Sequence, residues 1–235
     1  MATSAKSSAP RATGARTSRR QRRDEVRARL VSSALELAER GPFRDLSVDE
    51  IASAAGLSRS AFYTHFRDKH DLLLGAVEEV ADELYRMADR WWHGEGPPAD
   101  QVRVAIQGVV SVYSKHTGVL RVATEVSTYD DDVREFWLRV IQRFIDATAE
   151  HIYAEQAAGL IPTTLAPEPT AESLVWMVER CCYIHLARAE RKPVEVVRAL
   201  APVWTAALYP GVIPAEQLRP ARRASAVARR SQAPS

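Results

Sequence analysis

The sequence predicts an all-α protein: a small N-terminal bundle of three helices, a connecting helix, and a larger C-terminal helical bundle. Apolar residues recur at three- and four-residue spacing along most of the 235-residue chain, which is the period of an amphipathic helix. No segment alternates apolar and polar residues over a convincing strand length. Glycine and proline separate the periodic segments and mark where helices end.

The composition is that of an ordinary globular protein, with 46% apolar and 26% charged residues. No run approaches the roughly 20 apolar residues that span a bilayer, so no membrane contact is expected. The N-terminal stretch MATSAKSSAPRATGARTSRR lacks the apolar core of a secretory signal, which predicts a cytoplasmic protein. The adjacent Cys181 and Cys182 point about 100° apart in a helix, so we expect core thiols in a reducing compartment.

The net charge of +2 conceals a separation of charge along the chain. Residues 1–23 hold seven basic residues and no acid, and residues 211–235 hold five arginines against Glu216. Residues 24–210 hold 20 basic and 29 acidic residues. An acidic body with a basic N-terminal arm favours a partner that carries phosphates. On charge alone, a solvated disordered tail explains the arm equally well.

The N-terminal part predicts a disordered arm followed by three helices. Residues 1–20 are rich in Ser, Ala, Thr and Arg and are expected to be disordered. A helical pattern begins at Arg22 and stops at Gly41-Pro42. Two short apolar stripes, joined at a glycine, follow this stop.

The remainder of the chain predicts a connecting helix and five further helices. Asp68 can cap a helix that runs without a breaker to Trp91-Trp92. The acidic run at residues 130–132 suits the start of a long helix, because the helix dipole is positive there. The tail beyond Gly211 is polar and basic and is expected to be disordered. The five expected helices cover residues 99–115, 118–127, 131–158, 170–190 and 194–208.

The segment SVDEIASAAGLSRSAFYTHFRDK contains the signals of two short helices joined by a tight turn. Ser47 and Glu50 have the spacing of a capping box, in which each side chain satisfies a backbone N–H of the other residue. Gly56 stands where the chain reverses, a position that favours positive φ. Ser58 can cap the second helix, which is expected to run to Phe66.

The second short helix has an apolar face and a polar face. A guanidinium group can donate two hydrogen bonds to guanine in the major groove, while hydroxyls and helix-terminal amides hold phosphates. A surface helix with incidental polar residues is the alternative, and the joint presence of a capping box, a glycine turn and an aromatic repeat disfavours it. The inward face carries Leu57, Phe62 and Phe66, and the outward face carries Arg59, Ser60, Tyr63 and Thr64.

The stretch SVDEIASAAGLSRSAFYTHFRDKHDLL resembles the DNA-binding signature of the TetR family of transcriptional repressors. The resemblance covers about residues 25–75 and lies in the AGLS turn, the FYTHF helix and the helix start at Lys69. It implies a homodimer that binds a palindromic operator in double-stranded DNA, and an apolar small-molecule effector that releases it. No cofactor or metal is implied. The implied divisions are a disordered arm (1–20), a helix-turn-helix domain (21–67), a ligand-binding and dimerisation domain (68–211) and a disordered tail (212–235).

The resemblance also assigns DNA contacts by position. Arg59 is the candidate base reader, and Thr64 is expected to touch a phosphate or a thymine methyl group. Some members read a base with an arginine where this chain has Asp49, which would repel phosphate. The basic arm can follow the duplex or enter a minor groove. The expected contacts to the DNA backbone are Ser47, Ser58, Ser60, Tyr63, His65 and Lys69.

Apolar and aromatic residues form stripes on the C-terminal helices, and such stripes are core more often than pocket. The segments YSKHTGVLRVA, EFWLRVIQRFIDATAEHI, WMVER and VWTAALYPG resemble, in order and spacing, the C-terminal domain of one mycobacterial member of the same family. That domain has a long, mostly apolar channel. Over about residues 100–211, the resemblance places on the channel walls Ile106, Val109, Tyr113, Trp137, Ile141, Phe144, Thr148, Val175, Val178, Glu179 and Trp204.

The channel is expected to suit an aliphatic or sterol-like ligand. Val175 and Val178 stand where the similar repressor has amides, and Val109 stands where it has an aromatic wall residue, so this channel would be drier. Glu179 can equally well pair with an arginine such as Arg180. The polar groups expected to orient the ligand are Tyr113, Thr148 and Glu179.

The last two large helices, over about residues 170–208, are the implied homodimer interface. Its expected apolar contacts are Leu174, Cys181, Leu186, Val197, Leu200 and Val203. The sequence lacks HExxH, GxSxG, a glycine-rich phosphate loop and cysteine–histidine metal spacing, which argues against an enzyme. A ligand or lipid carrier whose N-terminal domain does not read DNA, and a non-specific DNA-binding protein, are the alternative functions.

Overall fold

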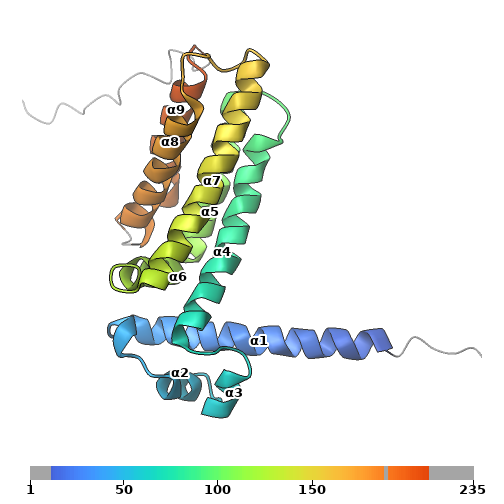
Figure 1. Ribbon diagram of the computed structural model, residues 1–235, viewed down its shortest axis with the longest axis vertical. Helices are drawn as coiled ribbons and strands as arrows, with labels where there is room; N and C mark the ends of the chain where they lie inside the picture. Colours follow the sequence, from blue (N-terminus) through green and yellow to red (C-terminus); the bar gives the residue numbers. More distant parts are fainter. Residues whose placement is uncertain (1–11, 188–189, 212–235) are drawn as a thin grey trace, which may run out of the picture.

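The computed structural model describes residues 12–187 and 190–211, and over these residues it contains helices and turns but no strand. In Figure 1, helix α1 (Ala12–Ala38) lies across the base of the molecule, with α2 (Val48–Ala54) and α3 (Arg59–Tyr63) beneath it. Helix α4 (Lys69–Trp92) rises from this base into a helical bundle. The all-α prediction is confirmed. Within the described ranges, no helix is both long enough and apolar enough to cross a bilayer.

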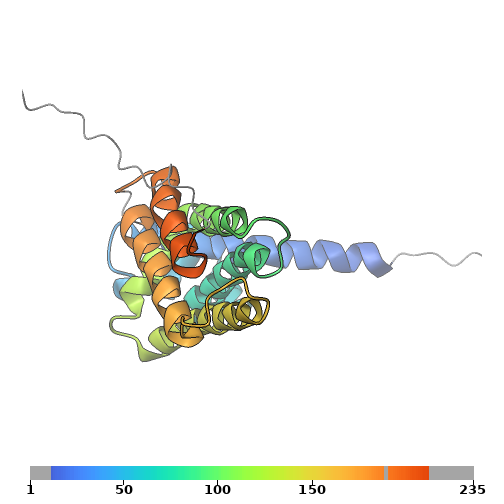
Figure 2. The same ribbon diagram turned by 90° about the horizontal axis from the view of Figure 1, so that it is seen from above.

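The C-terminal bundle packs along α4. Helix α4 packs against α5, α5 packs against α9, and α7 packs against α8. Seen from above in Figure 2, α1 projects well beyond this bundle. The five helices of the bundle are α5 (Pro98–Lys115), α6 (Thr117–Val126), α7 (Asp131–Ala157), α8 (Pro167–Cys182) and α9 (Pro193–Leu208).

The N-terminal helices share a core of apolar side chains. Ile51 on α2 and Phe62 on α3 are fully buried, as are Leu30 and Ala34 on α1. Burying one large apolar side chain contributes about 1.5–3 kcal/mol. Helices as short as α2 and α3 are not stable alone, so this core holds them in place.

Helix α1 begins at Ala12, ten residues before the predicted start at Arg22. The sequence predicts disorder up to residue 20, whereas the structure has residues 12–20 in helix. Alanine, arginine and glutamine are strong helix formers, and adding residues to an existing helix is easier than starting one. The predictions for residues 1–11 and 212–235 lie outside the described residues.

Helix α4 connects the N-terminal and C-terminal parts without a break. Its predicted N-cap is confirmed, because the Asp68 carboxylate accepts the N–H of Asp71 at 2.8 Å. Helix α4 packs against α1 and also against α5, α6 and α7.

Helix α6 makes a second connection between the two parts, which the sequence pattern does not predict. The Arg121 guanidinium donates to the carbonyl oxygen of Ala38, the last residue of α1, over 3.4 and 3.5 Å. The Glu125 carboxylate accepts the N–H of Phe43 at 3.3 Å. Phe43 opens the short 3-10 turn η1 (Phe43–Asp45), so α6 touches the segment that leads into α2.

The C-terminal helices begin and end close to the predicted residues, with one exception. Asp130 caps α7 as expected, because its carboxylate accepts the N–H of Val133 at 3.0 Å. The helix predicted for residues 170–190 begins at Pro167, which the sequence pattern places in a loop. Proline is favoured in the first turn of a helix, where its missing N–H costs nothing. Regular α-helix ends at Cys182 and continues as a π-helical turn, Tyr183–Ala187.

Candidate nucleic-acid interface and effector cavity

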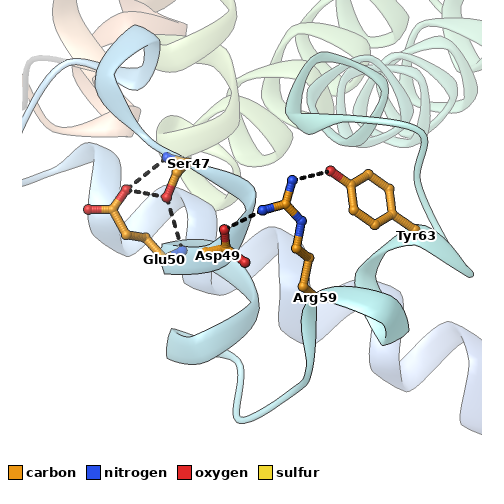
Figure 3. Close-up of polar contacts among 5 residues, drawn as sticks. All are labelled: Ser47, Asp49, Glu50, Arg59 and Tyr63. Atoms are coloured by element: carbon orange, nitrogen blue, oxygen red, sulfur yellow. Dashed lines mark hydrogen bonds and ion pairs between the residues drawn. The ribbon is translucent and has the colours of Figure 1, made fainter.

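Local signals in the sequence position α2 and α3. The Glu50 carboxylate accepts the N–H of Ser47 at 2.8 Å and the Ser47 hydroxyl accepts the N–H of Glu50 at 3.2 Å, which confirms the capping box (Figure 3). Gly56 has a φ of 65°, as the predicted turn requires. The Ser58 hydroxyl caps α3 by accepting the N–H of Ala61 at 3.2 Å.

Helix α3 ends at Tyr63, short of the predicted end at Phe66. The Thr64 hydroxyl donates to the carbonyl of Ala61 at 2.7 Å, and such a bond competes with the helical backbone pattern. The predicted division of faces is confirmed, because Phe62 and Phe66 are buried. The exposed side chains are Arg59, Ser60, Tyr63 and Thr64.

Arg59, in the first turn of α3, is held by two neighbours (Figure 3). Its Nη1 donates to Oδ2 of Asp49 on α2 at 2.6 Å, and its Nη2 donates to the Tyr63 hydroxyl at 3.3 Å. Both side chains of the ion pair are exposed, Arg59 to 60% and Asp49 to 59%. The hydrogen bond with Tyr63, followed by the charge of Asp49, raises the pKa of Arg59. The sequence suggests only a repulsive effect for Asp49, whereas in the structure this residue orients Arg59.

Hydroxyl groups surround Arg59 on the same surface. The hydroxyls of Ser58 and Ser60 lie 2.9 Å apart. The Tyr63 side chain is 47% exposed, and Ser47 is exposed at the start of α2. The first turns of α2 and α3 therefore present hydroxyls beside a guanidinium, which is the chemistry that phosphates and base edges bind.

Lys69 is placed differently from what the resemblance implies. Its ammonium donates to the backbone carbonyls of Phe43, Arg44 and Leu46 at 3.1, 2.5 and 2.7 Å. A lysine ammonium has three N–H donors, so contact with a phosphate requires giving up one of these bonds. Burial lowers the pKa of Lys69. In this structure, Lys69 positions the segment between α1 and α2.

His65 is half-buried between α3 and α1. Its Nδ1 is buried without a hydrogen-bond partner among the described residues, and its carbonyl accepts from Arg27 Nη1 at 3.0 Å. Burial, followed by the charges of Arg23 and Arg27, lowers its pKa. The ring is therefore neutral near pH 7 and would meet a phosphate only as a neutral donor.

A narrow cavity of about 80 Å³, partly open to solvent, lies between α4, α5, α7, α8 and α9. Its lining is mostly apolar with a few polar side chains, as is typical of small-molecule sites. All eleven positions that the resemblance assigns to channel walls line this cavity. The stripes on α5, α7 and α8 thus border a space, and α7 also packs against α8.

Seven further residues line the cavity and were not predicted. The stripe on α4 is visible in the sequence, but one apolar stripe can serve a core or a cavity, and α4 already has a connecting role. The Trp91 indole donates to the Tyr209 hydroxyl at 3.1 Å, and its ring meets that of Trp204 at a centroid distance of 5.6 Å. The unpredicted lining residues are Leu84, Ala88, Trp91 and Trp92 on α4, Val102 and Ala105 on α5, and Val140 on α7.

The three polar residues expected to orient a ligand are all buried in the cavity wall. Thr148, Glu179 and Tyr113 are 2%, 4% and 5% exposed. Oε2 of Glu179 lies 3.6 Å from Nε of Arg180, too far for a hydrogen bond. Glu179 therefore faces the cavity and also forms a loose ion pair. Burial raises the pKa of Glu179 and of Tyr113, whose pKa the charges of Cys182 and Glu179 raise further.

The outer faces of α8 and α9 carry the apolar side chains that a homodimer interface needs. Val194 and Val203 are about half exposed, and Cys181 and Val197 are partly buried. Helices at the edge of a bundle can carry two apolar stripes, and the pattern alone does not tell which one faces inward. The remaining predicted contacts, Leu174, Leu186 and Leu200, belong to the chain's own core, so their assignment to a dimer interface is wrong.

Comparisons with known proteins match both parts of the chain. The family model of bacterial regulatory proteins of the tetR family matches residues 30–76, and that of the C-terminal domain of the transcriptional regulator EthR matches residues 102–210. The HTH-type transcriptional regulator EthR of Mycolicibacterium smegmatis is 32% identical over 221 residues, covering 91% of this chain and 98% of that protein. EthR of Mycobacterium tuberculosis is 30% identical over 220 residues, covering 89% and 98%.

Solved structures agree with these matches. A TetR-family transcriptional regulator from Rhodococcus sp. has a TM-score of 0.65 at 25% identity, covering 80% of this chain and 98% of that chain. Another, from Syntrophomonas wolfei, has a TM-score of 0.68 at 14% identity, covering 78% and 94%, and supports the fold alone. The two family models span the short helices α2 and α3 and the helices α5 to α9. The chain belongs to the TetR family of bacterial transcriptional regulators and has EthR among its relatives.

Proposed function

We propose that this regulator is a homodimeric repressor that binds a palindromic operator through α3 and leaves it when an apolar small molecule fills the cavity. The observation that carries the proposal is the exposed guanidinium of Arg59, held by Asp49 and Tyr63 on the outer face of α3.

Arg59 supports base reading because it is charged, exposed and oriented before DNA arrives. Water screens an exposed ion pair, so exchanging Asp49 for the acceptors of a guanine costs little. Ser47, Ser58 and Ser60 flank the guanidinium and hold phosphates by hydrogen bonds. The same surface offers Tyr63 to a phosphate and Thr64 to a phosphate or a thymine methyl group, while His65 and Lys69 hold its supporting loops.

A twofold dimer through the outer faces of α8 and α9 would present two copies of α3 to the same side of a duplex. Two half-sites one helical turn apart lie about 34–36 Å from each other. The exposed side chains of Arg19 and Arg20 in the N-terminal half of α1 add sequence-independent attraction to DNA.

Occupancy of the cavity reaches the DNA-binding surface by two routes. Helix α4 lines the cavity and packs against α1. Helix α6 follows directly after α5, another cavity wall, and contacts the end of α1 through Arg121. A molecule that moves α4 or α5 therefore moves the reading helices out of register. Binding of the operator and binding of the effector then weaken each other by the same coupling free energy, typically about 1–3 kcal/mol.

The first test selects duplexes from a random library with the purified protein and compares the selected sequence with random DNA at fixed salt. A repressor prefers its operator by about a thousandfold or more. Arg59→Ala should lower operator affinity by about a hundredfold or more, because one base contact is lost in each of the two half-sites. Arg103→Ala, on the exposed side of α5, is the matched control and should change nothing. Equal affinity for selected and random duplexes would contradict the proposal and indicate a ligand carrier or a non-specific DNA-binding protein.

The second test concerns release. Native mass spectrometry of the purified protein identifies any molecule retained in the cavity, and the operator titration is repeated with that molecule at saturation. Operator affinity is expected to fall by about five- to 150-fold. An unchanged affinity would remove the coupling while leaving DNA binding in place.

A further inference from the structure

The apolar cavity has one charged side chain among the described residues that line it, Glu179 on α8. The residue is 4% exposed, and its Oε2 is buried without a hydrogen-bond partner in the described part of the chain. The Arg180 side chain lies 3.6 Å away and is 55% exposed, so water satisfies much of its charge instead. A buried acceptor without a donor is costly, and a donor on a bound molecule would recover that cost.

Glu179 lies near one end of an elongated space. The lining on α5 runs from Val102 to Tyr113, eleven residues apart and therefore about 16 Å along the helix. Trp92 ends α4 beside the start of α5, which places its indole at the Val102 end. Glu179 lies in the last turn of α8, just before the π-helical turn that packs against α5 and α6, and this places the carboxylate near the Tyr113 end of α5. The carboxylate thus lies at the end of the cavity opposite Trp92.

We propose that the effector is an elongated apolar amine whose ammonium group pairs with Oε2 of Glu179 and whose apolar tail extends towards Trp92. The inference rests on the proposed function only in taking this cavity as the effector site.

Charge distinguishes an amine from other amphiphiles of the same length. An ammonium donates a charge-assisted hydrogen bond to a carboxylate, whereas an alcohol donates a neutral one. A fatty acid would bring a second carboxylate beside the first, and two like charges disfavour each other in an apolar site. Burial raises the pKa of Glu179, and a neighbouring ammonium favours the ionised form, so amine binding and ionisation support each other.

The test titrates the full chain, without DNA, with dodecylamine, 1-dodecanol and dodecanoic acid. Four of the five tryptophans line the cavity, so their fluorescence reports its occupancy, and calorimetry supplies the affinities. Dodecylamine is expected to bind about tenfold tighter than dodecanol, since a hydrogen bond to a charged group is the stronger one. Dodecanoic acid is expected to bind most weakly. Equal affinities for the amine and the alcohol, or a preference for the acid, would overturn the proposal.

Glu179→Gln removes the charge and keeps the shape of the side chain. This variant is expected to lose the preference, with dodecylamine affinity falling about tenfold and dodecanol affinity unchanged. Glu172→Gln, on the exposed side of the same helix, is the matched control and should bind all three probes as the parent does. A preference for the amine that survives Glu179→Gln would show that another group recognises it. Should this variant not fold, the three-probe comparison on the parent chain decides alone.

These titrations need no operator, so the two proposals fail separately. If the protein prefers the amine but binds no specific duplex, this inference is supported and the proposed repression is contradicted. If the protein binds an operator but does not prefer the amine, the proposed repression is supported and this inference is contradicted.

Discussion

Two acidic side chains, one at each functional region, are held in opposite ways. Asp49 at the proposed DNA-binding surface is exposed and lies 2.6 Å from the guanidinium of Arg59. Glu179 in the cavity is 4% exposed, and its Oε2 has no hydrogen-bond partner among the described residues. Water makes the first pair easy to exchange, whereas burial makes the second side chain costly until a donor arrives. The proposed DNA-binding surface thus holds an acidic side chain with a partner, and the cavity holds one whose Oε2 has no hydrogen-bond partner among the described residues.

The largest expected effect separates the two faces of α3. Phe62→Ala removes a fully buried ring and should lower the free energy of unfolding by about 3–5 kcal/mol. Tyr63→Ala, at the neighbouring exposed position, should leave stability nearly unchanged but weaken operator binding. Urea denaturation checks the first expectation and operator titration the second. A Tyr63→Ala variant as unstable as Phe62→Ala would mean that the exposed face of α3 supports the fold as well.

The next effect tests whether the cavity carboxylate destabilises the empty protein. Glu179→Leu fills a similar volume without a buried charge, so the free energy of unfolding should rise by about 1–3 kcal/mol. Glu172→Leu, on the exposed side of α8, should change it by about 0.5 kcal/mol or less. Urea denaturation of the ligand-free proteins measures both. A loss of stability in Glu179→Leu would show that the carboxylate is satisfied in the empty cavity.

The same carboxylate should appear in the pH dependence of stability. Burial raises the pKa of Glu179 above its ordinary value of 4.5, so the folded chain binds this proton more tightly than the unfolded chain. The contribution of Glu179 to the free energy of unfolding is therefore greatest below pH 4.5. It falls as the pH rises towards the raised pKa and is constant above that pKa. In the Glu179→Gln variant, the free energy of unfolding should decrease less between pH 4.5 and the raised pKa than in the Glu172→Gln variant. Denaturation curves measured at several pH values in this range check the difference.

A smaller effect, on DNA specificity, tests the partner of Arg59. Asp49→Ala frees the guanidinium and removes a negative charge from the DNA-binding surface. Affinity for random DNA should rise while the ratio of operator to random affinity falls by about tenfold, the scale of one weakened base contact. Anisotropy titrations at two salt concentrations measure both quantities. A ratio that rises in Asp49→Ala would mean that the carboxylate only competes with DNA.

The smallest effect concerns a cap at the same exposed surface. Ser47→Ala removes the hydroxyl that accepts the N–H of Glu50 and should cost about 1 kcal/mol of stability. Ser53→Ala, exposed within α2, is the matched control and should cost nothing, because alanine is the better helix former. Thermal denaturation of the two variants gives the comparison.

The short helices α2 and α3 were predictable because their signals are local. The capping box at Ser47, the turn at Gly56 and the cap at Ser58 each depend on residues a few positions apart. The eleven residues assigned to the cavity wall were found through a resemblance, since an apolar stripe alone does not distinguish cavity from core.

Contacts between segments distant in sequence were not predictable. Nothing near Lys69 shows that its ammonium binds three carbonyls some 25 residues earlier. Asp49 and Arg59 meet only because the turn at Gly56 brings α2 and α3 together. Leu200 has the apolar character of an interface residue, and its burial follows from how α9 sits on α5.

The contacts of α6 bear on how regulators of this kind can be recombined. Arg121 and Glu125 bind backbone atoms of Ala38 and Phe43, so helices α1 to α3 are not joined to the C-terminal bundle through α4 alone. A hybrid that joins those residues to the body of a relative at position 68 would put foreign side chains opposite these backbone atoms. A crossover placed after Val126, where α6 ends, transfers Arg121 and Glu125 together with the N-terminal helices that they contact.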